Sequence, residues 1–437
     1  MLIEFTIGNY KSFKEKATLS MVATNVVSKD KSVDENNVCL INDDLSLLKS
    51  VAVYGANASG KSNLIAALRF MRRYVLDSSK ESQSDEPIPV KSFRLSTETD
   101  KAASFFEVVF LLEGRQYRYG FEVDRERVIS EWLYHVPARR EAKLFERTAE
   151  GITATSVFKE GKDLESRTRD NALFLSVVAQ FNGKLSQSIL RWFRSLTIIS
   201  GLQDSELMRQ TVKILEDSKT KDEILWLIKE LGVGIDDVRV QQLPFISSMP
   251  SNTPAELRSV FDDLAKLLAE RSIHFEDRFE IQTVHRQYDA TGKPVSEAIF
   301  DLETDESEGT KKIFALAGTV VSILQNGQIL VIDELDARLH PLIIRTLINL
   351  FNSRQTNPQN AQLIFATHDT NLLCKELFRR DQIWFTEKDR FGATHLYSLV
   401  EYKVRNDASF ESNYIQGRYG AIPYIGDLSQ VLGDARA

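Results

Sequence analysis

Residues 55–62 carry the most informative pattern in the chain: Gly55-Ala56-Asn57-Ala58-Ser59-Gly60-Lys61-Ser62. The pattern matches G-x-x-x-x-G-K-[ST], a loop whose backbone N–H groups surround the phosphates of a nucleotide. An apolar, β-prone run at 51–54 precedes the loop, and apolar residues at helical spacing follow from Leu64 to Val75. This strand–loop–helix order is the context that a phosphate-binding loop requires. We therefore expect Lys61 to reach the β- and γ-phosphates and Ser62 to bind Mg²⁺.

Two apolar strands in the last third of the chain end in polar residues. Residues 329–332 run into Asp333 and Glu334, which is the Walker B pattern. The carboxyl ends of parallel strands face the ligand crevice, so we expect Asp333 to support Mg²⁺ and Glu334 to polarise the attacking water. Residues 363–366 run through Thr367 into His368. His368 is either a hydrogen-bonded structural residue or, because the same crevice would hold the γ-phosphate, a sensor of that phosphate.

A third motif, Ser307-Glu308-Gly309-Thr310, opens the helix that precedes the Walker B strand. Ser307 or Thr310 would serve there as a helix N-cap, and the alternative is a nucleotide-binding signature. With these motifs in this order, the chain resembles the ATP-binding-cassette (ABC) ATPases, and within them the branch shared with chromosome-structure and double-strand-break-repair ATPases. In that branch the signature completes the nucleotide site of the opposite subunit. The resemblance implies a homodimer or a larger homo-oligomer that binds ATP and Mg²⁺.

More narrowly, the chain resembles the AAA15-type ATPases, a family that includes abortive-infection and other anti-phage ATPases of bacteria. The segments that carry this resemblance span nearly the whole chain: Phe5-x-Ile7-x-Asn9-Tyr10-Lys11-Ser12-Phe13, Tyr117-Arg118-Tyr119-Gly120, Glu131-Trp132-Leu133, Asn171-x-Leu173-Phe174-Leu175-Ser176, Glu306-Ser307-x-Gly309-Thr310 and Gly417-Arg418-Tyr419-Gly420-Ala421-Ile422-Pro423. It implies Lys61, Glu334 and His368 as the catalytic residues. It also implies that residues 55–62 contact the nucleotide, together with Asn63, Lys11, Ser12, Ser307, Gly309 and Thr310.

The resemblance further implies a function. An ATPase of this kind would sense invasion through ATP-dependent dimerisation and would control a separately encoded effector nuclease, with a phage protein or nucleic acid as the trigger. The alternative is a nucleotide-gated scaffold, or a repair-type DNA-binding ATPase, with little turnover. Nuclease activity of this chain alone, as in the related overcoming-lysogenisation-defect family, is not expected. Too few residues follow His368 to form a Toprim domain, and the six histidines form no HNH-like cluster.

The predicted fold class is α/β: an ABC-type P-loop ATPase head, with a mixed sheet flanked by helices, into which a β-meander and a helical subdomain are inserted. Alternating residues at 104–136 predict the meander, and helical periodicity predicts a mainly helical block at 170–272, with helices at 171–181, 185–196, 205–216, 221–231 and 255–270. The predicted domains are an ATPase lobe with the phosphate loop at 1–76, an antiparallel β subdomain at 77–150, a helical insertion at 151–273, and the second half of the ATPase lobe at 274–437.

Two features depart from the pattern of the ABC ATPases: the 272 residues that separate Asp333 from Lys61 (333 − 61), and the residue at the D-loop position. His340 occupies the position of the usual D-loop aspartate, so communication between the two nucleotide sites would differ. Gln180 is a candidate for the Q-loop glutamine, although a solvent-exposed helix residue is the alternative. The basic residues between Arg125 and Arg147 alternate with glutamates, which favours a solvated surface over a phosphate-binding patch. Lys311 and Lys312 are better candidates for contacts near the nucleotide.

Composition sets outer limits. The 437 residues carry a formal net charge of −7, so bulk charge does not attract the chain to nucleic acid. The only cysteines, Cys39 and Cys374, suggest neither a disulfide framework nor a zinc site, which fits a reducing, cytoplasmic compartment. Because apolar runs stay well short of the roughly 18 residues that span a bilayer, we expect no membrane segment.

Overall fold

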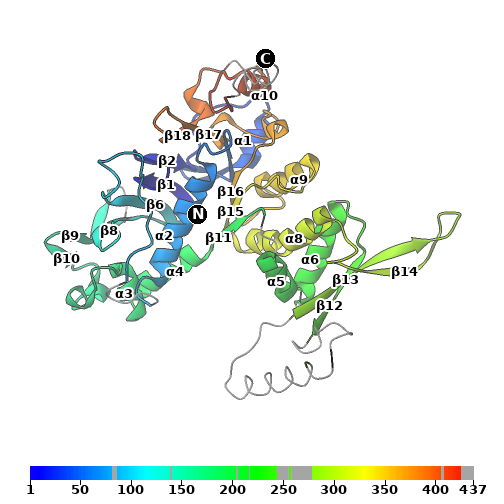
Figure 1. Cartoon of the computed structure of the whole chain (residues 1–437), viewed down its shortest axis with the longest axis horizontal. Coiled ribbons are helices and arrows are strands. Elements are labelled where there is room, and N and C mark those ends of the chain that lie inside the picture. The colour runs from blue at the N-terminus through cyan, green and yellow to red at the C-terminus, as the bar shows by residue number, and fades with distance from the viewer. Residues whose placement is uncertain are drawn as a thin grey trace, which may run out of the picture. The chain divides into compact units, whose positions relative to one another are not determined.

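A computed structural model describes residues 1–80, 86–137, 140–202, 205–215, 217–243, 254, 257, 278–404 and 408–424 (Figure 1). The chain forms two compact units. The first unit comprises Met1–Leu202, Ile323–Ala337 and Pro341–Ala437, and the second comprises Gln203–Ser322 and Arg338–His340. The phosphate loop and the Walker B strand therefore belong to the first unit, whereas the start of the signature helix belongs to the second.

The first unit contains an antiparallel sheet of seven strands in the order β10-β9-β8-β7-β6-β1-β2. Its strands are β1 (Leu2–Gly8), β2 (Ala17–Ser20), β6 (Ser104–Leu112), β7 (Arg115–Val123), β8 (Val128–Val136), β9 (Ala142–Thr148) and β10 (Gly151–Ala154). The predicted meander is confirmed. Strands β1 and β2 form an N-terminal antiparallel hairpin. Because β1 also pairs with β6, hairpin and meander form one continuous sheet.

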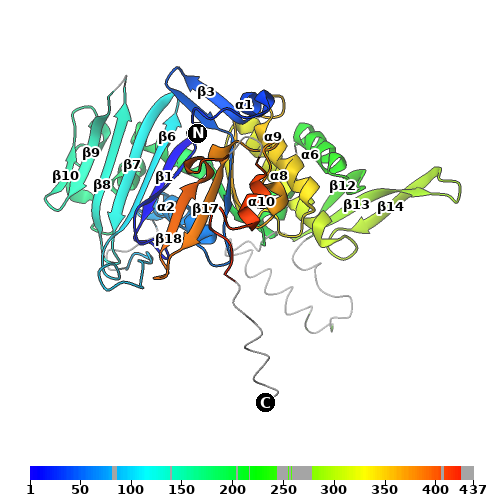
Figure 2. The ribbon, with the colours of Figure 1, turned by 90° about the horizontal axis from the view of Figure 1, so that it is seen from above.

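A second sheet of the first unit carries the phosphate loop. Its strand order is β11-β15-β16-β5-β17-β18, and only β18 runs antiparallel to its neighbour. Figure 2 shows β17 and β18 side by side. The strands are β5 (Ser50–Tyr54), β11 (Leu196–Ser200), β15 (Ile329–Asp333), β16 (Gln362–Ala366), β17 (Ile383–Lys388) and β18 (Thr394–Ser398). β5 is buried along its whole length, as its apolar sequence predicts. The carboxyl ends of β5, β15 and β16 therefore meet at one edge of the sheet.

Helix α2 (Lys61–Asp77) joins the two sheets into one core. It contacts β15 and β11 of the parallel sheet and β1 of the antiparallel sheet. Its predicted apolar face is buried, including Leu64, Leu68, Met71 and Val75. The other helices and strands of this unit are α1 (Lys31–Asn37), β3 (Val38–Asn42), β4 (Leu45–Leu48), α3 (Phe174–Gln180), α4 (Lys184–Arg194), α9 (Pro341–Asn352), α10 (Phe410–Ile415) and the 3₁₀ turns at 159–161, 165–167, 370–372, 380–382 and 399–401.

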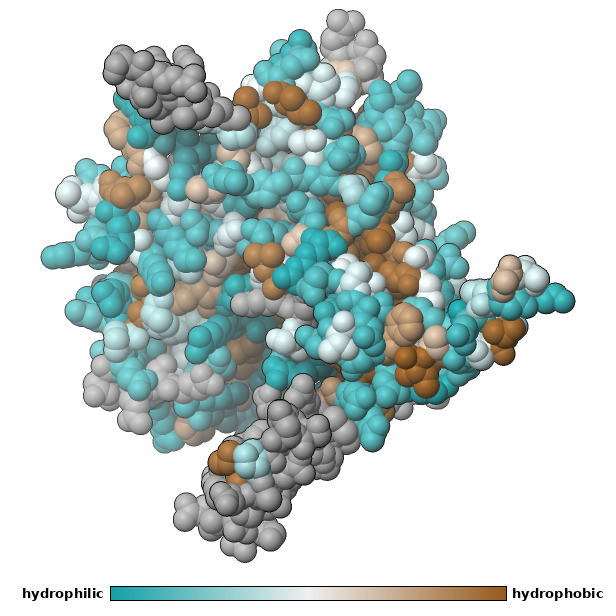
Figure 3. Space-filling view, turned by 45° about the vertical axis from the view of Figure 1, so that its right-hand side comes forward, coloured by the Kyte–Doolittle hydropathy of each residue, from teal (hydrophilic) through white to brown (hydrophobic). Residues whose placement is uncertain are grey.

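The second unit combines helices with a three-stranded antiparallel sheet of order β12-β13-β14. Its elements are α5 (Ser205–Ile214), α6 (Ser218–Glu230), β12 (Asp237–Leu243), β13 (Arg278–Tyr288), β14 (Pro294–Asp301) and most of α8 (Glu308–Asn326), whose last turn belongs to the first unit. The hairpin β13–β14 carries exposed apolar side chains (Figure 3): Tyr288, Val295, Ile299 and Phe300.

The block predicted as mainly helical is only partly so. Helices α3, α4, α5 and α6 confirm four of the predicted helices, whereas the fifth, at 255–270, lies outside the described residues apart from Leu257. Residues 196–200 and 237–243 instead form β11 and β12. β-Branched residues favour extended backbone, and β11 gains a parallel partner in β15 that local periodicity does not reveal. Among the described residues, no helix is long and apolar enough to cross a membrane.

Candidate functional site

The phosphate loop has the predicted strand–loop–helix geometry. It begins where β5 ends at Tyr54 and leads directly into α2 at Lys61. Gly55 and Gly60 adopt φ values of 153° and 125°, which side chains rarely tolerate, and Ala58 is left-handed at φ 61°. The loop therefore turns directly into the N-terminus of α2, where an anion is favoured.

Threonines from the C-terminal part of the chain hold this loop in place. Thr386 of β17 shares a 2.6 Å hydrogen bond with the Ser59 hydroxyl, and Thr394 of β18 donates to the Ser59 carbonyl at 2.8 Å. A Cβ atom on Gly55 would stand 2.4 Å from the Thr386 carbonyl oxygen, and one on Gly60 2.4 Å from Thr394 Oγ1. Sequence reasoning missed both threonines, because more than 300 residues separate them from the loop and no local pattern marks them.

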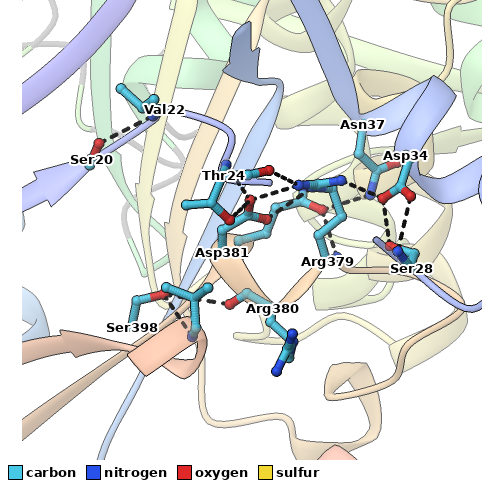
Figure 4. Close-up of polar contacts among 12 residues, drawn as sticks. Ser20, Val22, Thr24, Ser28, Asp34, Asn37, Arg379, Arg380, Asp381 and Ser398 are labelled. Carbon is cyan, nitrogen blue, oxygen red and sulfur yellow. Dashed lines mark hydrogen bonds and ion pairs between the residues drawn. The ribbon is translucent and has the colours of Figure 1, made fainter. Parts of the chain in front are cut away.

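Strand β17 is itself anchored by a buried ion-pair network (Figure 4). Arg379 donates to Asp381 and to the carbonyl of Thr24, and it also pairs with Asp34 of α1. Asp381 accepts further bonds from the backbone and the hydroxyl of Thr24. Because Arg379 and Asp381 are almost fully buried, the strand that supports the phosphate loop starts from a fixed point.

Lys61 is a buried cation at the mouth of the loop. Its Nζ atom donates to the carbonyl oxygens of Gly55 at 2.7 Å and Ala56 at 3.1 Å. Burial lowers the pKa of Lys61 to about 8, an effect that the nearby carboxylates of Asp333, Asp336 and Glu334 partly oppose. A polyanionic phosphate placed beside Lys61 would stabilise the charged form that burial disfavours.

The end of β15 provides the acidic groups. One carboxylate oxygen of Asp333, Oδ1, is buried and has no hydrogen-bond partner among the described residues. An orphaned buried carboxylate oxygen is costly, and a hard cation would satisfy it. Ser62 is exposed at the first turn of α2 and could supply a hydroxyl to the same cation. The residues present therefore fit Mg²⁺, with Asp333 and Ser62 as the predicted ligands.

Glu334 sits directly after that strand in a strained conformation. Its φ of 57° is left-handed, which turns the chain sharply after Asp333. Gly201, just beyond β11, donates to the Asp333 carbonyl at 2.6 Å, and a Cβ on Gly201 would stand 1.9 Å from the Glu334 carbonyl oxygen. Gly201 therefore permits the turn that presents Glu334, which is a role that the sequence did not reveal.

His368 follows β16 at the same edge of the sheet. Its backbone N–H donates weakly to the Asp336 carboxylate at 3.3 Å, and its side chain is exposed. Partial desolvation and then the positive charge of Lys61 lower the pKa of His368. Because the imidazole is neutral near pH 7, it can donate one hydrogen bond to an oxygen of an incoming phosphate. The sensor role stays a prediction.

Two of the N-terminal residues expected at the nucleotide also lie beside the loop. The Ser12 hydroxyl accepts hydrogen bonds from Asn63 at 2.7 Å and from Thr394 at 2.8 Å. Lys11 has a left-handed φ of 49°. Burial and the positive charges of Lys91 and Arg69 lower the pKa of Lys11, whereas Asp333 raises it. Lys11, Ser12 and Asn63 are thus positioned with the loop and Asp333 in the first unit.

The signature turn, residues 306–310, is built in the second unit. The Ser307 hydroxyl accepts from the backbone N–H of Thr310 at 3.1 Å and shares a 2.9 Å hydrogen bond with the Thr310 hydroxyl. Ser307 therefore caps α8, as one of the two interpretations predicts. Glu306 accepts hydrogen bonds from Thr283 at 2.6 Å and bonds His285 at 2.7 Å, both on β13. Ser307 is nevertheless exposed, so capping leaves its outer side open.

Comparison with known proteins identifies the family. Residues 50–374 match the family described as "AAA domain, putative AbiEii toxin, Type IV TA system". The chain belongs to this family. The matched range contains the phosphate loop, the signature turn, the Walker B strand and His368. No curated protein matches the chain.

Solved structures give a weaker likeness. The SMC head domain from Thermotoga maritima is 13% identical, with coverage of 91% of this chain and 98% of that one and a TM-score of 0.40. The SmcHead bound to the C-winged helix domain of ScpA is 15% identical, with coverage of 91% and 97% and a TM-score of 0.42.

The chain is thus an AAA-domain protein by family, and its structure has the predicted α/β fold with a phosphate loop. The match leaves the AAA15 subgroup unspecified.

Gln180 is exposed at the end of α3, as its alternative interpretation predicts. Lys312 is fully buried and Lys311 is partly exposed, and their expected contacts near the nucleotide stay a prediction. The basic residues of the meander are engaged in part, since the Arg147 side chain is buried and donates to backbone carbonyls.

Proposed function

We propose that the protein is an ATP-hydrolysing switch in which two copies close over two ATP molecules. One observation carries the proposal: the signature turn presents an exposed, capped Ser307 in one unit, while the phosphate loop, Asp333 and Glu334 belong to the other. The residue types of both parts suit the same triphosphate. A second copy would supply Ser307, Gly309 and Thr310 to ATP held by the first.

Each residue of the first unit then has a defined task. The backbone of residues 55–60 and the Lys61 ammonium bind the phosphates, and His368 hydrogen-bonds the terminal one. Bound Mg²⁺, held by Ser62 and Asp333, would neutralise developing charge on the phosphates. The Glu334 carboxylate orients water in line with the terminal phosphorus and accepts its proton. Hydrolysis removes the shared phosphate and so releases the partner, because closure depends on the higher affinity of ATP for the closed state.

The output of this switch is proposed to be bacterial defence. The family description names a putative toxin of a type IV toxin–antitoxin system, and the motif order resembles that of anti-phage ATPases. Closure would respond to a phage protein or nucleic acid and would release or activate a separately encoded nuclease. Plaque counts on cells carrying the gene with its neighbouring reading frame test this output. Protection that persists in Lys61→Ala would contradict it.

The mass of the purified protein tests the dimer. Glu334→Gln should bind ATP and Mg²⁺ without hydrolysing the ATP. Light scattering should therefore give it the mass of a dimer or a larger assembly. Lys61→Ala should stay monomeric under the same conditions, since it lacks the cation that binds the phosphates. A monomeric Glu334→Gln protein saturated with ATP would disprove the shared site.

The same two variants separate a hydrolytic switch from a nucleotide-gated scaffold. Defence lost in both variants indicates that turnover is required. Defence retained in Glu334→Gln but lost in Lys61→Ala indicates that ATP binding alone suffices.

A further inference from the structure

Glu308, in the middle of the signature turn, neutralises two cations at once. Its Oε1 atom lies 3.0 Å from Lys311 Nζ, and its Oε2 atom lies 2.9 Å from Arg338 Nη1. These contacts lower the pKa of Glu308, so the carboxylate is charged at neutral pH. All three residues belong to the second unit. One exposed carboxylate therefore holds an ammonium and a guanidinium beside the exposed Ser307.

The backbone fixes Arg338 at this turn. Arg338 has a left-handed φ of 64°, and its carbonyl oxygen would lie 3.2 Å from a Cβ atom on Gly309. Arg338 also follows Glu334 by only a few residues in the sequence. The segment after the Walker B strand thus delivers an arginine to the signature turn. Its side chain is 43% exposed, so the guanidinium is accessible without unfolding the turn.

We propose that Arg338 and Lys311 bind the terminal phosphate of ATP held by a second copy, and that Glu308 occupies these cations until that copy docks. The inference rests on the proposed function, because it requires the signature turn to face the partner's nucleotide. A guanidinium binds phosphate oxygens through paired hydrogen bonds, and a triphosphate carries more negative charge than one carboxylate. When the second copy docks, Arg338 and Lys311 therefore exchange the Glu308 carboxylate for the more highly charged phosphate. Glu308 keeps the cations from binding other anions meanwhile.

A purely structural role for these ion pairs makes a different prediction. If Glu308 and Arg338 only brace the turn, removing either one loosens the same turn, and both changes weaken dimerisation. If Glu308 competes with the phosphate, the two changes act in opposite directions. Glu308→Gln removes the carboxylate that competes with the phosphate and strengthens the dimer, whereas Arg338→Ala weakens it. The sign of the Glu308 effect therefore decides between the two roles.

The test measures the dimer dissociation constant by sedimentation in saturating ATP and Mg²⁺, with every variant built on Glu334→Gln. We expect Glu308→Gln to lower this constant about tenfold and Arg338→Ala to raise it at least about tenfold, the range seen for close interfacial charge pairs. Arg338→Lys should fall between Arg338→Ala and the parent, because lysine keeps the charge but loses the paired geometry.

A matched pair in the same unit serves as the control. Arg239 and Glu297 form a 2.6 Å ion pair with side-chain exposures of 47% and 62%, close to the 43% and 60% of Arg338 and Glu308. Arg239→Ala and Glu297→Gln should leave the dissociation constant unchanged. Dilute, monomeric Arg338→Ala should bind fluorescent ATP as the parent does, because a monomer binds ATP through its own phosphate loop.

The outcomes separate this inference from the proposed nucleotide site shared by two copies. If the parent does not dimerise with ATP, or if a blocking Gly309→Arg change has no effect, the shared site and this inference both fail. If the parent dimerises and Gly309→Arg disrupts it, but Glu308→Gln weakens the dimer or leaves it unaltered, this inference alone is wrong. It is also wrong, with the shared site intact, if Arg338→Ala dimerises like the parent.

Discussion

The phosphate loop and the signature turn bring functional groups to the surface by different physical means. The loop is held by buried contacts, since Thr386 and Thr394 hydrogen-bond Ser59. Gly55 and Gly60 leave no room for a side chain, and the buried Lys61 is largely desolvated. The turn is held by hydrogen bonds and ion pairs on exposed side chains, with Ser307 and Glu308 both accessible. Packing makes a site rigid and intolerant of change, whereas exposed polar contacts can exchange partners.

The largest expected effect concerns the buried cation. Lys61→Ala should lower ATP hydrolysis by two to three orders of magnitude, roughly 3–4 kcal/mol of transition-state stabilisation, because one preorganised electrostatic contact is lost. Phosphate release measures it. Lys49→Met is the control: Lys49 lies just ahead of β5, at its other end, is also buried and has a pKa also lowered to about 8. Undiminished ATP hydrolysis by Lys61→Ala would show that the buried lysine is not required, and it would contradict the view that the loop is intolerant of change.

Packing around the loop is tested by two glycines of matched backbone. Gly60 and Gly151 have φ values of 125° and 126°, but only a Cβ on Gly60 meets other atoms within 4 Å. Gly60→Ala should lower the free energy of unfolding by about 3 kcal/mol, from strain and overpacking together. Gly151→Ala should cost about 1 kcal/mol, from strain alone. Urea unfolding followed by circular dichroism measures both. Equal costs would mean that packing against Thr394 is unimportant.

A buried lysine outside the site gives a smaller, pH-dependent effect. Burial is the main cause that lowers the pKa of Lys49 to about 8. Cys39 raises this pKa, and the charge of Arg354 lowers it. The unfolded state then binds more protons between pH 8 and about 10.5, so stability should rise with pH across that window. Lys49→Met should stabilise the fold by about 2 kcal/mol at pH 7, and the difference from wild type should vanish as the pH approaches 10.5. A pH-independent difference would contradict the shifted pKa.

The smallest expected effect lies in the signature turn. Ser307→Ala should lower the free energy of unfolding by about 1 kcal/mol, because the N-cap of α8 is lost. Ser307→Asp should keep the cap and the stability, yet it should prevent ATP-dependent dimerisation, because a carboxylate would face the phosphates of the partner's nucleotide. Thermal unfolding and light scattering read out the two effects. Dimerisation by Ser307→Asp would contradict a phosphate-facing turn.

The sequence predicts the parts of the site that are local in the chain. The phosphate loop, the Walker B strand and the strand before His368 are each recognisable because strand, turn and helix signals adjoin within a few residues. The N-cap at Ser307 is predictable for the same reason, since cap and bonded N–H are three residues apart. The phosphate loop, the end of the Walker B strand and His368 also lie where the parallel sheet aligns its carboxyl ends, which the apolar runs imply.

The remaining features depend on contacts between distant residues. Thr386 and Thr394 carry no motif, and their role appears only when β17 and β18 lie beside β5. Periodicity places β11 within a helical block, because its short apolar run does not reveal its partner β15. The pairing of Glu308 with Arg338 likewise joins two motifs that are separate in the sequence.

The position of β5 has a consequence for synthesis on the ribosome. Its two neighbours, β16 and β17, lie more than 300 residues further along, as do the threonines that hold the loop. A nascent chain therefore cannot assemble a functional phosphate loop until β16, β17 and β18 have been synthesised. Until then the apolar β5 has neither native neighbour, and an unpaired apolar strand is prone to aggregation.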